Sequence, residues 1–379
     1  MTCGLCDMPA AISPDPGESN TMSTLLRQAR TSLETMSPGY FSMVMATGIL
    51  SLAAHLLELP LLARALFAFN WALFALICVL ALTRLYWHRR RVIEDLFDHL
   101  RAPGFFTFVA ACSILGCQSL LIGASLPVAK ALGVIGLISW IGFTYTIFTV
   151  LTVKRPKPSL DRGINGGWLL AVVATQSMAV LAALIAAEVA QPLRLELNFF
   201  ALSMWLWGGM LYIWMMSLIF YRYTFFEFSP ADLSPPYWIN MGAMAISTLA
   251  GSLLILNTPH APFLNSILPF IKGFTVFYWA TGTWWIPMLL VLAIWRHVIR
   301  RFPFTYDPMY WGAVFPMGMY AVCTLRMMQA MDLTFLGMLP HFMFSAGLLA
   351  WTLLFIGQLR ALWRNWNASI VLSAQHRRD

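Results

Sequence analysis

Charge is the property that this sequence has least of. Only 11% of its 379 residues are charged, whereas 59% are hydrophobic and the mean hydropathy is +0.71. A chain with so few polar groups cannot cover a globular core in water. The composition therefore excludes a soluble globular fold and predicts an integral membrane protein.

Acidic residues are missing from the middle of every long apolar run. Four carboxylates come near, but each lies close to the end of a run: Glu58, Glu188, Asp307 and Asp332. A charge buried in hydrocarbon costs a few kcal/mol even by lenient scales, so proteins that relay protons on side chains keep such residues for that function. Their absence argues against a carboxylate proton relay and against a cation filter built on an acidic ring.

Sets of catalytic and metal-binding residues are missing as well. We find no Gly-rich phosphate loop and no Ser/His/Asp set, and His55 and His341 lie too near the ends of apolar runs to support a haem. Cys3 and Cys6 have the spacing of a metal or redox pair, but zinc needs four ligands and no second pair follows. The other four cysteines fall within apolar runs, where cysteine behaves as a small apolar residue. We expect no enzyme activity, no catalytic residue, no metal and no cofactor.

Long apolar runs are abundant. Each is about 20 residues or longer, enough to cross a hydrocarbon layer of about 30 Å as a helix. They cover 38–57, 61–84, 104–123, 127–152, 167–187, 197–221, 235–257, 269–295, 309–328 and 335–360. We predict ten transmembrane helices within one transport domain at 37–362, between an N-terminal tail at 1–36 and a C-terminal tail at 363–379.

The N-terminal tail contains apolar residues at helical spacing, which predicts an amphipathic helix lying in the membrane interface. These residues are Met22, Leu25, Leu26, Ala29, Leu33 and Met36. Because no short apolar core with a cleavage site precedes the first run, we do not expect a removable signal peptide.

Basic residues predict the orientation in the membrane. With ten spans, 19 of the 24 Lys and Arg residues fall before the first span, in alternate loops or after the last span, and five fall on the opposite side. By the positive-inside rule both termini are cytoplasmic, and the protein is expected in the inner (plasma) membrane. The net charge of +8 then reflects loop topology and contact with lipid headgroups, not binding to nucleic acid.

A short motif recurs five times, at intervals of 63 to 73 residues between its aromatic positions. Its copies are Pro38-Gly39-Tyr40-Phe41, Pro103-Gly104-Phe105-Phe106, Gly166-Gly167-Trp168-Leu169, Pro235-Pro236-Tyr237-Trp238 and Pro308-Met309-Tyr310-Trp311. The register continues: Val or Met stands four residues after the aromatic, and Ala or Pro stands six after it. Such repeats indicate quasi-symmetry. We predict an all-α fold of five quasi-equivalent helical hairpins around a central pore.

The five spans that follow the motif contain many small and polar residues, whereas the alternate spans are plainer. Hydrocarbon offers no hydrogen-bond partner, so the polar spans should lie inside and the plain ones outside. The predicted pore-lining and solute-contacting residues are Thr47, Gln118, Thr175, Gln176, Asn240 and Thr248. The alternative is that small residues merely let helices pack closely, and that Gln176 and Asn240 form inter-helix hydrogen bonds.

An uncharged pore with hydroxyl, amide and backbone N–H donors suits anions. The cytoplasmic ends of the inner helices are their N-termini, where the helix dipole favours negative charge. Arg and Lys residues at the same mouth raise the local concentration of anions. The expected partners are a small anionic solute and membrane lipid.

Several long stretches resemble the tellurite-resistance/dicarboxylate transporter family, which includes plant guard-cell slow anion channels, bacterial tellurite-resistance proteins, and yeast malate and sulfite permeases. The stretches are 45–49, 165–176 and 235–243, and the resemblance extends from Ser37 to about Leu362. It implies homotrimers in which each subunit has its own pore, lined by the five odd-numbered spans. It also implies a pore gate at Phe315, beside the helix-kinking Pro316, where the alternative is ordinary packing of one Phe among 27.

The resemblance leaves two functions open. The first is a carrier of C4-dicarboxylates such as malate, which we favour for a chain of this length; the second is a gated channel or efflux pathway for chloride, nitrate, sulfite or tellurite. A receptor or scaffold would give no flux at all. The sequence departs from the family in having a proline inside only one inner span, with Gly48, Gly116 and Gly242 inside others, so pore width stays open.

Overall fold

The computed structural model describes the backbone of residues 30–303 and 308–375, and the side chains of 30–303 and 309–364. Ser37–Gln358 form one compact unit, and the two chain ends form another. All regular structure in the described residues is helical. Most of the predicted interfacial helix and the Cys3/Cys6 pair lie outside the described residues, although residues 30–35 are helical.

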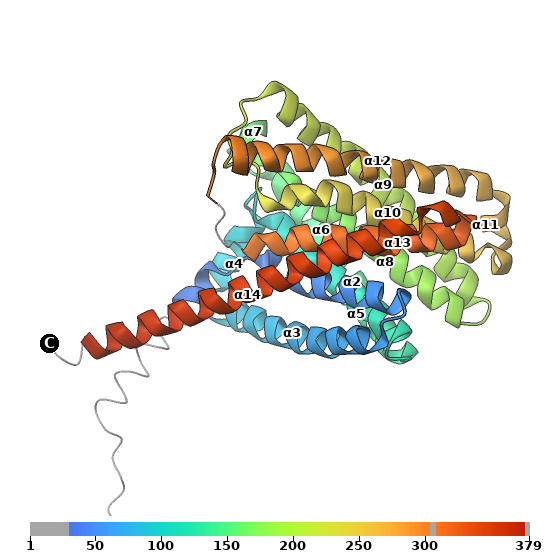
Figure 1. Ribbon diagram of the computed structural model, residues 1–379, viewed down its shortest axis with the longest axis horizontal. Coiled ribbons are helices and arrows are strands. Elements are labelled where there is room, and N and C mark those ends of the chain that lie inside the picture. Colours follow the sequence, from blue (N-terminus) through green and yellow to red (C-terminus); the bar gives the residue numbers. More distant parts are fainter. Residues whose placement is uncertain (1–29, 304–307, 376–379) are drawn as a thin grey trace, which may run out of the picture. The chain divides into compact units, whose positions relative to one another are not determined.

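Each of the five inner helices, labelled α2, α5, α8, α10 and α13 in Figure 1, is preceded by a short 3₁₀ turn. The pairs are η1 (Pro38–Phe41) with α2 (Ser42–Leu56), η2 (Ala102–Phe105) with α5 (Phe106–Leu121), η3 (Gly166–Leu169) with α8 (Leu170–Glu188), η4 (Pro235–Trp238) with α10 (Ile239–Leu256), and η7 (Pro308–Tyr310) with α13 (Trp311–Met331). These turns are the recurring motif of the sequence.

Five longer outer helices alternate with the inner ones along the chain. They are α3 (Pro60–Trp87), α6 (Leu126–Val153), α9 (Leu193–Phe225), α12 (Leu268–Ile294) and α14 (Met338–Gln375). Short elements complete the chain: α4 (Arg89–Leu96), α7 (Leu160–Gly163), η5 (Thr258–His260), α11 (Pro262–Ser266), the π-helical η6 (Trp295–Ile299) and η8 (Thr334–Leu336).

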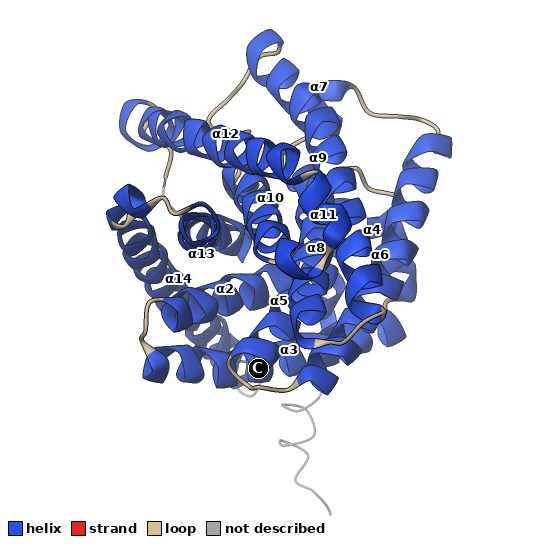
Figure 2. Ribbon diagram, turned by 90° about the vertical axis from the view of Figure 1, so that its right-hand side faces the viewer, coloured by secondary structure: helices blue, strands red, loops and turns tan. Residues whose placement is uncertain are grey.

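The inner helices follow one another in a closed cycle. Helix α2 packs against α5, α5 against α8, α8 against α10, α10 against α13, and α13 returns to α2. Figure 2 views this arrangement end-on, with α3, α6, α9, α12 and α14 around the outside. In the most apolar 18-residue segment of each helix, 72–94% of the residues are buried in α2, α5, α8 and α10. The corresponding share is 17–22% in α3, α6, α12 and α14, and 56% in α9. The polar helices therefore lie inside and the plain ones outside.

Nine helices of the described residues are long and apolar enough to cross a membrane. The ninth expected span, 309–328, corresponds to α13, which is not among the nine. With 21 residues α13 is about 31 Å long, close to the thickness of the hydrocarbon layer. It is mostly buried, so it needs less apolar surface than an outer helix does. The count of ten spans stays a prediction.

The 3₁₀ turns form a second closed cycle at one end of the inner helices. η1 contacts η2, η2 contacts η3, η3 contacts η4, η4 contacts η7, and η7 contacts η1. The approach is backbone to backbone: a Cβ on Gly166 would lie 2.6 Å from the carbonyl oxygen of Pro236, and one on Gly104 would lie 2.9 Å from the Gly39 nitrogen. This proximity explains why glycine recurs in the motif.

The positions that follow the motif are buried in every repeat. The residues four after the aromatic are fully buried, as are the alanines six after it. They are Val44, Val109, Val172, Met241 and Val314, and then Ala46, Ala111, Ala174 and Ala243. The sequence register thus marks contacts between neighbouring inner helices, where side-chain volume is limited.

We expect Gly166→Ala to destabilise the protein by about 1–3 kcal/mol, because the new methyl group overlaps the backbone of η4. The measurement is the midpoint of thermal unfolding of purified protein in detergent. Gly142→Ala is the matched control, since a Cβ there meets no atom within 4 Å and Ala favours the helix. Equal midpoints for the two variants would contradict the close approach of η3 and η4.

Candidate functional site

A narrow cavity of about 20 Å³ lies between the inner helices, toward their C-terminal ends. All five helices contribute to its wall. The lining residues are Leu52, Leu56, Ile114, Cys117, Leu121, Val180, Leu184, Leu249, Leu253, Val322 and Arg326. A space of this size holds about one water molecule.

Most of the lining residues fall at two positions of the sequence repeat. Counted from the motif aromatics Tyr40, Phe105, Trp168, Tyr237 and Tyr310, the position twelve residues later holds Leu52, Cys117, Val180, Leu249 and Val322. The position sixteen residues later holds Leu56, Leu121, Leu184, Leu253 and Arg326. We call these the twelve layer and the sixteen layer. The quasi-equivalence inferred from sequence therefore extends to the cavity wall.

The same face of each inner helix carries the fifth and ninth positions, because spacings of 4, 3 and 4 residues follow one helical stripe. The position five residues after the motif aromatic, which we call the five layer, holds Met45, Ala110, Val173, Gly242 and Phe315. Phe315 is the only aromatic residue of this layer. Phe315 is 1% exposed and lies two turns before Val322 on α13. By this spacing Phe315 falls on the same stripe, two turns from the residues that line the cavity. Next to it, Pro316 packs against α10, since a Cβ on Gly242 would lie 2.7 Å from the Pro316 ring.

The three predicted threonines are fully buried, and their hydroxyls have protein partners. Trp351 of α14 donates to Thr47 at 2.9 Å, and Trp140 of α6 donates to Thr175 at 2.8 Å. The Thr248 hydroxyl donates to the Met244 carbonyl of its own helix. The structure therefore directs the Thr47 and Thr175 hydroxyls toward outer helices.

The contacts of Thr47 and Thr175 belong to a cycle of five hydrogen bonds. In each, a side chain of an outer helix donates to the inner helix of the next repeat. The donor–acceptor pairs are Asn70 to Gln118 (2.7 Å), Trp140 to Thr175 (2.8 Å), Trp205 to the Ser247 carbonyl (2.8 Å), Trp279 to Thr324 (3.0 Å) and Trp351 to Thr47 (2.9 Å). The last pair returns from the fifth repeat to the first, so the cycle closes.

The three predicted amides each keep one atom without a hydrogen-bond partner among the described residues. Gln118 accepts from Asn70, Gln176 donates to the Trp205 carbonyl at 3.0 Å, and Asn240 donates to Tyr223 at 3.2 Å. The second polar atom of each amide is buried and unpartnered. A buried atom in that state costs about 1–3 kcal/mol. Each of these amides therefore keeps one buried polar atom that can bind a further partner.

Cations lie at one end of the outer helices, the end nearest the closed cycle of 3₁₀ turns, which we call the ring of turns. Lys154 donates to the Phe97 carbonyl, and Arg296 donates to the Leu233 carbonyl. Arg222 binds the Ile164 carbonyl, the Tyr237 hydroxyl and the Asp232 carboxylate. Each of these three cations thus binds a loop that leads into an inner helix.

Burial alone would raise the pKa of Asp232. Hydrogen bonds from Ser229 and the charge of Arg222 outweigh burial, and together they lower the pKa of that carboxyl. Asp232 therefore stays ionised near neutral pH beside the buried Arg222.

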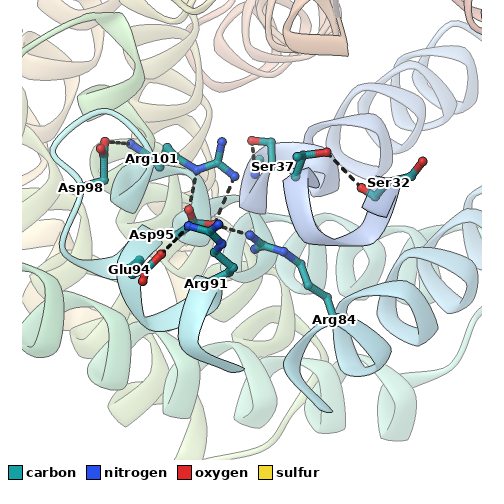
Figure 3. A network of polar contacts seen from close by, with 10 residues as sticks. Ser32, Ser37, Arg84, Arg91, Glu94, Asp95, Asp98 and Arg101 are labelled. Atoms are coloured by element: carbon teal, nitrogen blue, oxygen red, sulfur yellow. Dashed lines mark hydrogen bonds and ion pairs between the residues drawn. The ribbon is translucent and has the colours of Figure 1, made fainter. Parts of the chain in front are cut away.

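Asp95 forms the most buried ion pair of the described residues. Arg84 approaches one carboxylate oxygen at 2.7 Å, and Arg101 approaches the other at 2.5 Å (Figure 3). Next to it, hydrogen bonding from Arg91 lowers the pKa of the exposed Glu94 carboxyl. The Asp95 pair joins α3, α4 and the start of η2.

One residue of the cavity wall, Arg326, is missing from the residues predicted as a site. The sequence did contain a signal, because no other Lys or Arg lies in the five apolar runs that form the inner helices. The apolar character of the stripe was also not predicted. Hydropathy could not reveal it, since both faces of an inner helix are buried in protein and only the structure distinguishes them.

We expect Asp95→Asn to lower the free energy of unfolding by about 3–5 kcal/mol, because the buried Arg84 loses this counter-charge. The midpoint of thermal unfolding should fall accordingly. The measurement is thermal unfolding in detergent at neutral pH. Glu94→Gln removes a carboxylate one residue away whose Arg partners are exposed, so its effect should be small. A larger loss in Glu94→Gln than in Asp95→Asn would contradict this account of the buried pair.

Comparison with known proteins agrees with the geometry. Residues 35–359 match the family model described as SLAC1, voltage-dependent anion channel. Two proteins of Methanocaldococcus jannaschii named as uncharacterized transporters are 26% and 25% identical over 300 residues, covering 76% and 77% of this chain and 82% and 84% of theirs. An uncharacterized membrane protein of Mycobacterium tuberculosis is 38% identical over 152 residues, which cover 40% of this chain and 77% of that protein.

Proposed function

The chain belongs to the voltage-dependent anion channel (SLAC1) family, and on that premise we propose that anions cross the membrane along the axis of its five inner helices. The protein is a multi-pass membrane protein of a family of channels and transporters, not of enzymes. The observation that carries the proposal is the cavity wall, to which every inner helix contributes its twelve-layer and sixteen-layer residues. Quasi-equivalent residues meet in this way only around a shared axis.

Phe315 is the proposed gate of this pathway. It is fully buried and is the one aromatic ring in a layer whose other members include Gly242 and Ala110. A large apolar side chain at a narrow point stops ions by excluding water. Pro316 supports the ring, because it removes one backbone hydrogen bond of α13 and packs against α10 beside Gly242.

The proposed solute contacts rest on the polar residues of the inner helices. Gln118, Gln176 and Asn240 are the stronger candidates, because each has a buried amide atom that still needs a partner. Thr175 and Thr248 donate their hydroxyl protons to carbonyls of their own helices, so they could donate to an anion only after giving up those bonds, whereas Thr47 accepts its hydrogen bond from Trp351. The contacts of Thr47 and Thr175 with outer helices favour a packing role for these two residues.

The geometry favours small inorganic anions as the solute. The wall is apolar apart from one arginine, and the cavity holds about one water molecule. A C4-dicarboxylate carries two charges and a longer carbon chain, so it would need a wider opening and a second cation. A malate-type carrier is the second candidate, and saturable, pH-dependent uptake of labelled malate would support it over a channel for chloride, nitrate, sulfite or tellurite.

The remaining features of the proposal concern topology and assembly. We propose ten spans arranged as five hairpins. The protein would lie in the inner (plasma) membrane with both termini in the cytoplasm. The cations at the turn end of α6, α9 and α12 support this orientation. We also propose a homotrimer in which each chain keeps its own pathway, which light scattering of the detergent complex would test.

We expect Phe315→Ala to raise anion flux at least about tenfold, since removal of the ring would open the proposed gate to water. The measurement is chloride flux in liposomes that contain the purified variant. Tyr320→Ala is the matched control: Tyr320 is fully buried on the same helix, but its hydroxyl contacts Thr283 of α12 and its ring stacks on Trp279, so it faces an outer helix. Unchanged flux in Phe315→Ala, or an equal rise in both variants, would remove the gate assignment.

A further inference from the structure

We infer that Arg326 binds the permeating anion at the end of the pathway opposite the ring of turns. The inference rests on the proposed function and adds the residue that selects for negative charge. It also narrows the ligand to small monovalent anions, because the described cavity wall supplies one positive charge.

The first observation is the position of Arg326 in the repeat. The sixteen layer holds leucine in four repeats and arginine in the fifth: Leu56, Leu121, Leu184, Leu253 and Arg326. Leucine at this position closes the wall with apolar contacts. The arginine therefore breaks the pattern at the point where five quasi-equivalent side chains meet around one axis.

The second observation is that Arg326 shares a helix face with the proposed gate. It lies eleven residues after Phe315 and four after Val322, on the stripe that lines the cavity. At 1.5 Å per residue it is about 16 Å beyond Phe315 along α13. An anion that passes the ring of Phe315 then meets the twelve layer and next the guanidinium.

The third observation is the lack of a counter-charge. None of the ion pairs found among the described residues involves Arg326, whereas the buried Arg84 and Arg222 both pair with carboxylates. Its described side-chain contact is a hydrogen bond from Nη1 to the Gln329 amide oxygen at 2.6 Å. A partly buried cation without a counter-ion is electrostatically incomplete, and a bound anion would complete it.

The chemistry of guanidinium indicates which anions bind best. Its N–H groups form a planar fork that matches two oxygen atoms of one oxyanion, which a lysine ammonium cannot do. Gln329 occupies one N–H group and so orients the others. We therefore expect nitrate to bind more tightly than chloride at this site.

A structural role for Arg326 would have different consequences. A cation near the C-terminal end of a helix stabilises the helix dipole, and its long side chain can extend toward the lipid headgroups. Such a role would affect folding or the amount of protein inserted. Loss of Arg326 would then lower flux by the same factor at low and at high anion concentration, and it would not change the ratio of nitrate flux to chloride flux.

The test compares Arg326→Gln with Arg64→Gln in liposomes, in both the wild-type and the Phe315→Ala background. Arg64 is exposed on α3, at the same end of the helices as Arg326, and does not line the cavity. We expect Arg326→Gln to lower chloride and nitrate flux at low anion concentration by about tenfold, the loss typical of one charged hydrogen bond. Arg64→Gln should change flux by less than about twofold, because exposed charges act weakly through screening.

Arg326→Lys keeps the charge and loses the fork. We expect its chloride flux to stay within about threefold of the wild-type flux, and its ratio of nitrate flux to chloride flux to fall. This variant also tests the inference if Arg326→Gln fails to fold. An unchanged ratio, or equal losses in Arg326→Gln and Arg64→Gln, would overturn the assignment of Arg326 while anion transport stands. Absence of flux in the wild type and in Phe315→Ala would instead overturn the proposed function, and with it this inference.

Discussion

The fold depends on hydrogen bonds that hold each inner helix to the outer helix of the preceding repeat. In hydrocarbon, polar groups must find partners within the protein, and the cycle from Asn70 to Trp351 supplies one such hydrogen bond for each of the five repeats. Because Trp351 reaches back to Thr47, the fifth repeat is fixed to the first. A closed ring follows, and closure determines which face of each inner helix turns inward.

An apolar axis is a direct consequence of these contacts. Once the hydroxyls and amides bind outer helices, the opposite face of each inner helix is left with Leu, Val and Ile, and only the cavity between them remains. A pathway of this kind needs no charged filter in order to be closed, since water leaves a narrow apolar space and ions cannot follow without it. In the proposed pathway, the ring of Phe315 would be the gate and the charge of Arg326 would give the preference for negative solutes.

Much of the fold was predictable from sequence because membrane proteins obey few rules strictly. Hydropathy identified nine helices that the structure confirms as candidate spans, and the recurring Pro and Gly motif marked the 3₁₀ turns at Pro38, Ala102, Gly166, Pro235 and Pro308. The small residues in the motif have a physical origin in the backbone contact between Gly166 and Pro236. The segregation of polar helices inside and plain helices outside is also confirmed by their burial.

The site was harder to predict because both faces of an inner helix are buried. Thr47 and Thr175 are polar and lie on inner helices, yet their hydroxyls bind Trp351 and Trp140 of outer helices. Sequence shows which helix a residue belongs to, whereas the stripe that faces the axis emerges only when lining residues from all five repeats are aligned. Arg326 carried a sequence signal as the lone basic residue of the inner runs, but its meaning depends on its four leucine counterparts.

The most direct test of the central claim is to locate the anion itself. Crystals grown in bromide allow the anion to be placed by anomalous scattering, without any assumption about flux. A path along the inner ring predicts a bromide peak on its axis between the five layer and the sixteen layer, most strongly in Phe315→Ala. Bromide found only between subunits or outside the ring, in a protein that still conducts anions, would contradict the account.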